Sequence, residues 1–345
     1  MAIKLLSDLV TVVSEHISNP STSGFEIFVG LEHYDAGEPV ITRYGSTANL
    51  ESSVKHFIEG DILVARRNVY LKRAGVVKFE GVTSGDSIVL RVKDDSYKDI
   101  IPFVLNTEDF WDYAEQNSDG TMSKRLAPDV LLEYECDIPD NHREIAAKLW
   151  AAYELKEAYK KMIAATDEMV KSQFIEMFGN PVEWQNDDSI PVLSDTVDVI
   201  SGYPFDAEQF NSEGNGVALI RIRDIQRGYT ETFTTEAFDE KYRINKGDLL
   251  IGMDGMFDIA RWQSASAALN QRVCCLRMKD AENDIFIQYL VQPILKHIEL
   301  GTNATTVKHL STKQINAIRI PKATECQKSS FASIVKQADK SKYIS

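Results

Sequence analysis

The stretch IKLLSDLVTVVS, residues 3–14, recurs as IPVLSDTVDVIS at residues 190–201, a shift of 187 positions. Other blocks match in the same order: EGDILV around Asp61 matches KGDLLI around Asp248, and LRVKD matches LRMKD. Near the end of each copy, DGTMSKRLAPDVLLEYECDIP resembles LGTNATTVKHLSTKQINAIRIP. The shift drifts only between 181 and 187 positions across these blocks. Such ordered self-similarity indicates an internal duplication.

The duplication sets the expected domain organisation. Its period is far longer than the roughly 20–50 residues of a solenoid repeat, so each copy is predicted to be a whole domain of about 140 residues. We expect a first domain over residues 1–140, a central spacer helix over 141–179, a second domain over 180–321 and a distal spacer helix over 322–345.

Short apolar runs between Gly, Asn and Asp turns predict strands within each copy. These runs are Ile62–Ala65, Val76–Phe79, Ser87–Val92, Val217–Arg223, Asp248–Ile251 and Arg272–Met278. Shorter helices are expected over Lys98–Gln116 and Asp284–Glu299. The predicted fold class is mixed α/β of the α+β type, with two duplicated domains separated by long antiparallel coiled-coil helices.

Residues 141–179 predict one uninterrupted helix, because the segment lacks Pro and ends in the stop signal Gly179-Asn180-Pro181. About 37 residues make a helix of about 55 Å, too long to fold inside either domain. Its narrow apolar seam favours a helical partner, and the only other candidate is the tail after Pro321, which is shorter and fits a truncated end. The residues expected to form this coiled coil and to dock partner subunits are Ile145, Leu149, Ala152, Tyr159, Ile163, Val170, Phe174 and Met177, with Phe331, Ile334, Val335 and Ala338 on the tail.

The composition limits the functions that the chain can have. A net charge of −14 and a pI of about 5.0 argue against a protein that coats nucleic acid by bulk electrostatics, so any DNA contact must use local basic patches or the charge of a partner. The four cysteines lack C-x-x-C spacing and neighbouring histidines, and are expected to be reduced thiols. The N-terminus lacks a signal-peptide pattern, and no stretch approaches the roughly 20 apolar residues of a membrane span. A cytoplasmic location is therefore expected.

Motifs for catalysis and for cofactor binding do not occur in the sequence. It has no G-x-G-x-x-G and no G-x-x-x-x-G-K-[ST], which argues against nucleotide-binding loops. NPVEW at 180–184 lacks the second Pro and the adjacent aromatic of adenine methyltransferases, so a turn is expected there. The six histidines lack metal-ligand spacing, and the acidic run at 236–241 matches a nuclease site only at the level of chance. We expect no catalytic residue, no metal site and no cofactor bound by this chain.

Basic residues nevertheless gather locally in each copy. Arginine makes bidentate contacts with guanine, Lys and Arg hold phosphates, and Asn or Gln suits adenine. For each residue taken alone, an ordinary solvated surface is the competing interpretation. The predicted DNA-binding residues are Arg66, Arg67, Tyr70, Lys72 and Arg73 in the first copy, and Arg221, Arg223, Arg227, Lys241, Arg243, Asn270, Gln271 and Arg272 in the second.

These features together resemble the specificity subunits of type I restriction-modification systems. The resemblance covers nearly the whole chain. It is most specific at the helix exit VKSQFIEMFGNP, residues 170–181, in the paired Gly-Asp strands, and in the closing block from Gly301-Thr302 to IRIP at 318–321. The first copy departs somewhat from this closing pattern and ends in DIP at 137–139.

The resemblance implies a DNA-recognition subunit that is not itself an enzyme. Each domain would read one half of a bipartite target in double-stranded DNA, and the helices would set the spacing. Two modification (methyltransferase) subunits would bring S-adenosylmethionine and methylate adenine, and restriction or translocase subunits would join when present. Two alternatives stay open: the recognition half of a fused restriction-methylation enzyme, for which the start at Met1 is unfavourable, and a tandem module that binds no DNA, such as an acidic DNA mimic.

Overall fold

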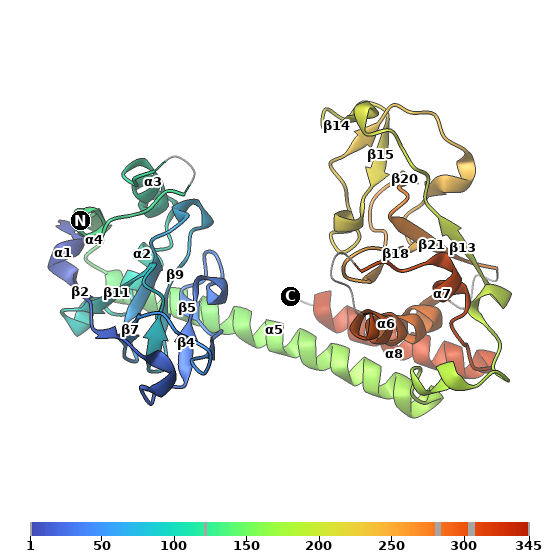
Figure 1. Cartoon of the computed structure of the whole chain (residues 1–345), viewed down its shortest axis with the longest axis horizontal. Helices are drawn as coiled ribbons and strands as arrows, with labels where there is room; N and C mark the ends of the chain where they lie inside the picture. Colours follow the sequence, from blue (N-terminus) through green and yellow to red (C-terminus); the bar gives the residue numbers. More distant parts are fainter. Residues whose placement is uncertain (1, 121–122, 280–283, 303–307, 344–345) are drawn as a thin grey trace. The chain divides into compact units, whose positions relative to one another are not determined.

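The computed structural model describes residues 2–120, 123–279, 284–302 and 308–343. Two compact units divide the chain between Tyr159 and Lys160, within the long helix α5 (His142–Phe178). The colours of Figure 1 follow the chain from the first unit through α5 into the second (Figure 1). Each unit combines mostly antiparallel sheets with helices, which confirms the predicted mixed α+β class.

The first unit is built on two five-stranded sheets. Its strands are β1 (Ala2–Leu5), β2 (Val10–Val13), β3 (His16–Ile17), β4 (Ile27–Val29), β5 (Val40–Ile41), β6 (Gly45–Ser46), β7 (Val54–Phe57), β8 (Ile62–Ala65), β9 (Ala74–Val77), β10 (Gly81–Thr83), β11 (Ser87–Val92) and β12 (Glu135–Ile138), and its short helices are α1 (Leu6–Leu9), α2 (Ile101–Val104), α3 (Glu108–Gln116) and α4 (Pro128–Leu132). The sheet orders are β2-β11-β8-β9-β5 and β3-β7-β10-β4-β6, and β1 pairs with β12.

The second unit repeats this plan with a longer helix over its core. Its strands are β13 (Val197–Ser201), β14 (Phe210–Asn211), β15 (Val217–Ile220), β16 (Phe233–Thr234), β17 (Arg243–Ile244), β18 (Leu249–Gly252), β19 (Ile259–Arg261), β20 (Ala267–Leu269) and β21 (Val273–Met278), and its helices are α6 (Asp284–Gly301), α7 (Thr312–Asn316) and α8 (Glu325–Tyr343). The sheet orders are β13-β21-β18-β19 and β14-β16-β15-β20-β17.

The central strands of the sheets correspond between the two units. The order β2-β11-β8-β9 corresponds to β13-β21-β18-β19, with every neighbouring pair antiparallel. In the other sheet, β10 pairs parallel with β4 and antiparallel with β7, as β20 does with β15 and β17. The duplication read from the sequence therefore extends to strand order and strand direction.

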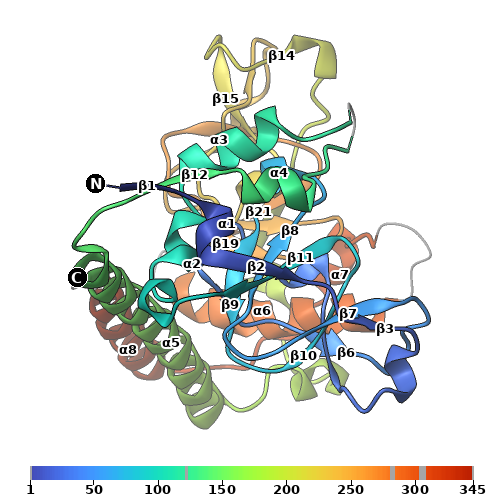
Figure 2. The ribbon, with the colours of Figure 1, turned by 90° about the vertical axis from the view of Figure 1, so that its left-hand side faces the viewer.

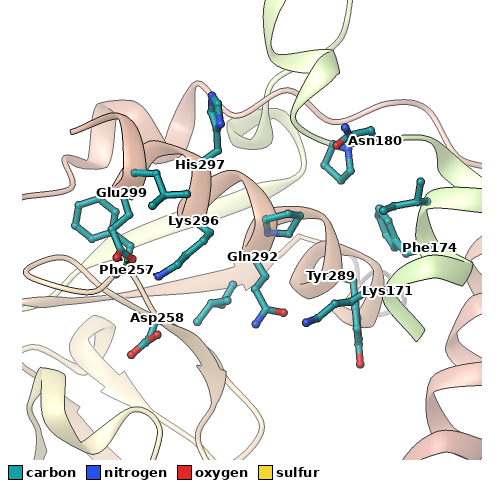
Figure 3. A pocket seen from close by; sticks show the side chains of 15 residues that line it. Lys171, Phe174, Asn180, Phe257, Asp258, Tyr289, Gln292, Lys296, His297 and Glu299 are labelled. Atoms are coloured by element: carbon teal, nitrogen blue, oxygen red, sulfur yellow. Dashed lines mark hydrogen bonds and ion pairs between the residues drawn. The ribbon is translucent and has the colours of Figure 1, made fainter. Parts of the chain in front are cut away.

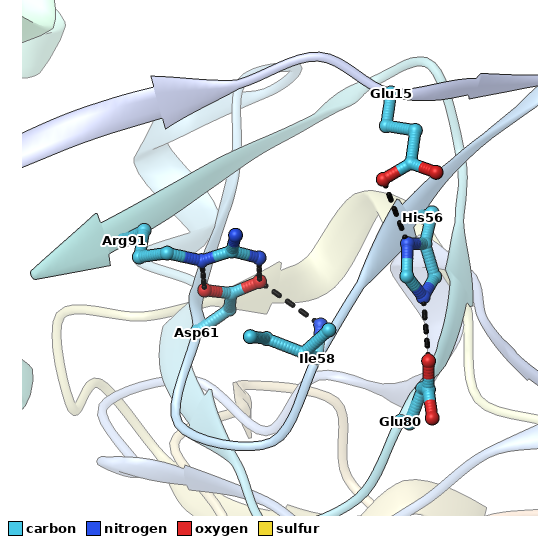
Figure 4. A network of polar contacts seen from close by, with 6 residues as sticks. All are labelled: Glu15, His56, Ile58, Asp61, Glu80 and Arg91. Atoms are coloured by element: carbon cyan, nitrogen blue, oxygen red, sulfur yellow. Dashed lines mark hydrogen bonds and ion pairs between the residues drawn. The ribbon is translucent and has the colours of Figure 1, made fainter.

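The repeated motifs of the first unit bind one another. Asp61 of the Gly-Asp turn accepts hydrogen bonds from Ile58 N at 2.9 Å and from Arg91 at 2.8 and 2.7 Å (Figure 4). Arg91 belongs to the LRVKD block, and Lys93 of the same block donates to the carbonyl of Ser7 at 2.6 Å. Three separate sequence blocks thus meet at one corner of the sheet.

The second unit repeats these contacts at the corresponding positions. Asp248 accepts from Asn245 N at 3.0 Å, and its carboxylate lies 3.6 Å from the Arg277 guanidinium. Lys279 donates to the carbonyl of Ser194 at 2.8 Å. The residues that recur in the sequence are therefore the residues that fasten the Gly-Asp turn and the opening segment to the sheet.

Three predicted elements differ from the structure: the strand predicted over 76–79 lies at Ala74–Val77 as β9, and two other elements differ for local reasons. The strand predicted over 217–223 stops short, because Asp224 accepts a hydrogen bond from Arg221 N at 2.9 Å and closes a turn. The helix predicted over 98–116 is two helices, α2 and α3. Thr107 caps the second helix through its hydroxyl oxygen, at 3.3 Å from a backbone N–H of the first turn, and so defines a new helix start.

The long helix forms as predicted, with 37 residues ending at Phe178. Its first turns are fixed to the first unit: Ala146 is buried in the core of that unit, and Trp150 Nε1 donates to the carbonyl of Asp99 at 2.9 Å. His142 stacks on Tyr97, with ring centroids 4.8 Å apart. The start of α5 is therefore part of the first unit's packing.

The last turns of α5 pack against α8 within the second unit. Val170 and Phe174 share a hydrophobic core with Phe331, Val335 and Ala338. The rings of Phe174 and Phe331 lie 5.2 Å apart. Figure 1 shows α8 beside the C-terminal half of α5 and running in the opposite direction, and Figure 2 shows the two helices side by side. The predicted antiparallel pairing is thus found at this end of the helix.

Of the residues predicted for the coiled coil and for docking of partner subunits, those near the start of α5 contact the first unit and not α8. Ile145 packs against the first core, and Leu149 and Ala152 line a hollow with Phe103 of α2. The physical reason is length, because α8 has 19 residues against the 37 of α5. The other predicted seam residues are half-buried, as Met177 and Ile334 are, or about two-fifths exposed, as Tyr159 and Ile163 are.

Candidate nucleic-acid interface

The predicted basic cluster of the first unit is divided by the fold. Lys72 forms an ion pair with Glu108 of α3. Arg73 donates to the carbonyls of Leu31 at 2.9 Å and Arg67 at 3.2 Å, which gives it a structural role between two loops. Tyr70 is exposed on the short turn between β8 and β9.

Arg66 and Arg67 remain together, on the loop that follows β8. Two basic residues that were not predicted from the sequence, Lys55 and Arg125, lie near them. Asp86 lies between Arg67 and Arg125, at 3.7 and 3.2 Å. The ammonium group of Lys55 donates to the carbonyls on either side of Asp86, at 3.2 and 2.7 Å. Burial lowers the pKa of Lys55, and the nearby charge of Arg66 lowers it further. The first unit thus places Arg67, Arg125 and Lys55 around one carboxylate, with the charge of Arg66 near Lys55.

The loop after β15 carries the first basic group of the second unit. Arg221, Arg223 and Arg227 are all exposed there. The Arg223 guanidinium lies 3.4 Å from the hydroxyl oxygen of Thr232 and 3.8 Å from Asp224. The turn closed by Asp224 therefore presents three guanidinium groups from one short segment.

The predicted residues Lys241 and Arg243 are engaged by neighbours of their own loop. Arg243 donates to both carboxylate oxygens of Glu240, at 2.6 and 2.8 Å, and this bond lowers the pKa of Glu240. Asp239 accepts from Lys241 N at 3.0 Å and caps the turn. In the acidic run at 236–241, the carboxylates of Asp239 and Glu240 therefore bind groups of their own loop.

The segment 270–272 forms the turn into β21. Asn270 is buried, and its side-chain oxygen accepts from Arg272 N at 3.4 Å. Gln271 and Arg272 are exposed. The Arg272 guanidinium pairs with Asp254 at 2.9 Å, and His309 approaches the other oxygen of that carboxylate at 2.6 Å. Asp254 and His309 were not predicted, because they are far from residue 272 in the sequence.

A hollow of about 550 Å³ lies among the end of α5, the loop after β18 and α6 (Figure 3). Its walls are mainly apolar and include Phe174, Phe257 and Tyr289. The Glu299 carboxylate at its rim accepts from Lys296 at 3.1 Å and from Phe257 N at 3.1 Å. None of the predicted DNA-binding residues lines it.

Metal-ligand groups, cysteine thiols and apolar helices were the remaining features to compare with the sequence predictions. Within the described ranges, no group of three or more His, Cys, Asp or Glu residues is arranged to hold a metal ion. Burial raises the pKa of the Cys136 thiol to about 12 and raises the pKa of Cys274 as well, so neither is ionised near neutral pH. No described helix has the length and apolarity needed to cross a bilayer.

Comparison with known proteins finds similarity in the second unit. Residues 192–342 match the family model described as the type I restriction modification DNA specificity domain. The type I restriction enzyme EcoBI specificity subunit of Escherichia coli is 35% identical over 130 residues, which are 37% of this chain and 27% of that protein. The matched part thus spans about a quarter of that relative's length.

A solved structure shares the fold. The S subunit of the type I restriction-modification system from M. genitalium aligns with 99% of this chain and 90% of its own, at 14% identity and a TM-score of 0.54. The HsdS subunit from Thermoanaerobacter tengcongensis aligns with 99% of this chain and 89% of its own, at 15% identity and a TM-score of 0.41. The second unit is thus similar to type I restriction modification DNA specificity domains over residues 192–342, and the first unit shares the order of its core strands.

Proposed function

We propose that this chain is the DNA sequence-recognition subunit of a type I restriction-modification enzyme, and that it is not itself catalytic. The observation that carries the proposal is the duplication: two domains that share the order of their central strands, one of which matches a DNA specificity domain, are joined by α5. Two related domains on one chain suit a bipartite target, because each can read one half of it. The exposed arginines of each unit suit phosphates and guanine edges.

Partner subunits complete this proposal. Two methyltransferase subunits would bind S-adenosylmethionine and methylate adenine, and restriction subunits would join them where they are present. The helices α5 and α8 would set the spacing between the half-sites and offer docking surfaces. A partner that clamps DNA also accounts for a recognition subunit with a net charge of −14.

The test is co-expression of this chain with its co-encoded adenine methyltransferase, followed by mapping of methylated adenines across the genome. The expected result is a split motif with two fixed halves, present only with this chain. A stable complex that adds no methylation would contradict the proposal and favour an acidic protein that mimics DNA. Such a mimic would also bind no duplex DNA at low salt.

A further inference from the structure

The two units share a backbone junction where three loops meet. Equivalent hydrogen bonds join the loop after β8 or β18, the turn before β11 or β21, and the closing block before α4 or α7. In the first unit they are Arg66 N to Asp86 O at 2.9 Å, Leu126 N to Arg66 O at 2.8 Å and Asn68 N to Lys124 O at 2.9 Å; in the second they are Met253 N to Arg272 O at 3.0 Å, Leu310 N to Met253 O at 2.7 Å and Gly255 N to Lys308 O at 2.9 Å.

The backbone conformation of this junction is also the same. Asn68 has φ 56° and Gly255 has φ 74°, so both copies use a left-handed residue at the equivalent position. Glycine and asparagine are the residues that adopt this conformation most readily. The junction is therefore a built feature of the domain, retained in both copies.

The side chains on this backbone differ between the two copies, because acidic and basic residues exchange positions. In the first unit, Asp86 on the turn pairs with Arg67 on the loop and with Arg125 in the closing block. We call this set of three the first ion junction. Arg67 and Arg125 are 47% and 51% exposed, while Asp86 is 25% exposed, so the carboxylate is more buried than the two guanidinium groups.

The second ion junction has the acid and the base exchanged. Asp254 occupies the loop position of Arg67, and Arg272 occupies the turn position of Asp86. His309 stands where the first unit has Arg125, directly before the leucine of the closing block. Arg272 and His309 are each 57% exposed and Asp254 is 20% exposed. One carboxylate is again more buried than the two basic side chains that it contacts, but the arginine is on the turn in the second unit and on the loop in the first.

A guanidinium that is paired with a carboxylate is preorganised for binding, because less side-chain conformational entropy is lost when it contacts a ligand. Arginine has five N–H donors, so the pairing with one carboxylate leaves donors for a phosphate or for guanine. In the first unit Lys55 and Arg66 add positive charge beside the junction. Polyanionic duplex DNA is the partner that this local charge fits.

We infer that the two ion junctions are DNA-contacting points of the two domains, with Arg67, Arg125 and Arg272 contacting DNA and Asp86 and Asp254 as positioning residues. The inference rests on the proposed function and adds the residues by which equivalent domains differ. A constant backbone with an exchanged arginine position lets two copies of one fold meet different half-sites.

The test uses the full chain in complex with its methyltransferase subunits and a pool of random-sequence DNA duplexes. Selected duplexes give the preferred bases at each half-site, and binding at several salt concentrations gives the number of phosphate contacts. The variants are Arg125→Ala, Arg272→Ala and the double exchange Arg67→Asp/Asp86→Arg, which gives the first junction the charge order of the second. Arg43→Ala is the matched control, since Arg43 is 51% exposed and pairs at 2.8 Å with Asp35, which is not a residue of either junction.

The expected result is that Arg125→Ala and Arg272→Ala each weaken binding about tenfold, and affect opposite half-sites. A lost phosphate contact would also lower the salt slope by about 0.9. The double exchange should keep the melting temperature and change the selected bases of one half-site only. Arg67→Asp alone should lower the melting temperature, because two carboxylates would then face each other.

Failure of the inference can be distinguished from failure of the proposed function. If the unaltered complex selects a split target and both alanine variants select and bind it as the Arg43→Ala control does, the inference is wrong and the proposed function stands. Equal losses at both half-sites from either variant also overturn the inference. If the unaltered complex selects no duplex, the proposed function fails and the inference fails with it.

Discussion

The carboxylate of Asp61 accepts two hydrogen bonds from the guanidinium of Arg91, at 2.8 and 2.7 Å, with the Asp61 side chain only 1% exposed. The corresponding pair of the second unit, Asp248 and Arg277, is looser, at 3.6 Å, and its carboxylate is 24% exposed. The same motif is therefore a stronger fastening in the first unit than in the second.

Replacing Asp61 by Asn should cost the first unit more stability than Asp248→Asn costs the second. Removal of one partner of a buried charged pair is costly, but Arg91 is 42% exposed, so we expect about 2 kcal/mol for Asp61 and about 1 kcal/mol or less for Asp248. Hydrogen exchange followed by mass spectrometry resolves the two units separately. Asp35→Asn, which removes an exposed pair with Arg43, is the control and should change exchange little. Equal effects at positions 61 and 248 would contradict this ranking.

The stability of the first unit should depend on pH through His56. Burial alone would lower the pKa of His56, but hydrogen bonds to Glu15 at 3.0 Å and Glu80 at 2.8 Å outweigh it and raise this pKa (Figure 4). A raised pKa in the folded state means that the contribution is fully present below about pH 6.5 and is lost as the pH rises through the folded-state value. Urea denaturation between pH 5.5 and 8.5 measures it. The double variant Glu15→Gln/Glu80→Gln should flatten this dependence, and an unchanged profile would rule His56 out as its source.

Phe174→Ala should loosen the packing between α5 and α8. The ring of Phe174 is buried and lies 4.9, 5.5 and 5.2 Å from the rings of Phe178, Phe286 and Phe331. Truncation of a buried Phe typically costs about 3–5 kcal/mol. The neighbouring variant Ile175→Ala is the control, since Ile175 is 51% exposed and should cost only about 0.5 kcal/mol. Similar melting temperatures for the two variants would contradict the packing described for this end of α5.

Gly202→Ala should disturb the turn that carries Arg272. A Cβ at position 202 would lie 2.0 Å from the carbonyl oxygen of Asn270, so the backbone must shift. Gly301→Ala is the control, because a Cβ at position 301 meets nothing within 4 Å. We expect Gly202→Ala to lower the melting temperature by several degrees, about the effect of a 1–2 kcal/mol loss, while the control stays near the unaltered chain. A melting temperature for Gly202→Ala equal to that of the control would show that the turn can absorb the shift.

Arg223→Ala and Arg243→Ala compare an exposed arginine with one whose guanidinium is bound by a neighbouring carboxylate. Arg223 is exposed after β15, whereas Arg243 donates twice to Glu240. Under the proposed function, Arg223→Ala should weaken DNA binding about tenfold at one half-site and Arg243→Ala much less. Filter binding with duplexes altered in one half at a time measures both. A larger loss for Arg243→Ala would mean that its pair with Glu240 opens when DNA binds.

Much of the fold was predictable from the sequence, because the repeated sequence blocks contain the residues that contact one another in each unit. Strands β8 and β11 fall on their predicted ranges, since each is a run of β-branched and apolar residues between turn signals. The helix α5 ends where the Gly-Asn-Pro signal indicated. The seam of α5 was only partly predictable, because periodicity gives an apolar face but not what covers it. Ile145 and Phe174 lie on similar patterns, yet one packs on the first core and the other against α8.

By itself, the sequence determined that the chain is two copies of one α+β domain with a long helix between them, because local periodicity and self-similarity need no long-range information. Only the tertiary structure decided which charges meet. Arg67, Asp86 and Arg125 are separated by tens of residues, and the fold brings them to one junction, while Lys72 is turned away to Glu108. The physical reason is that side-chain pairing depends on where the loops of different strands converge, and that convergence is set by the packed sheets rather than by neighbouring residues.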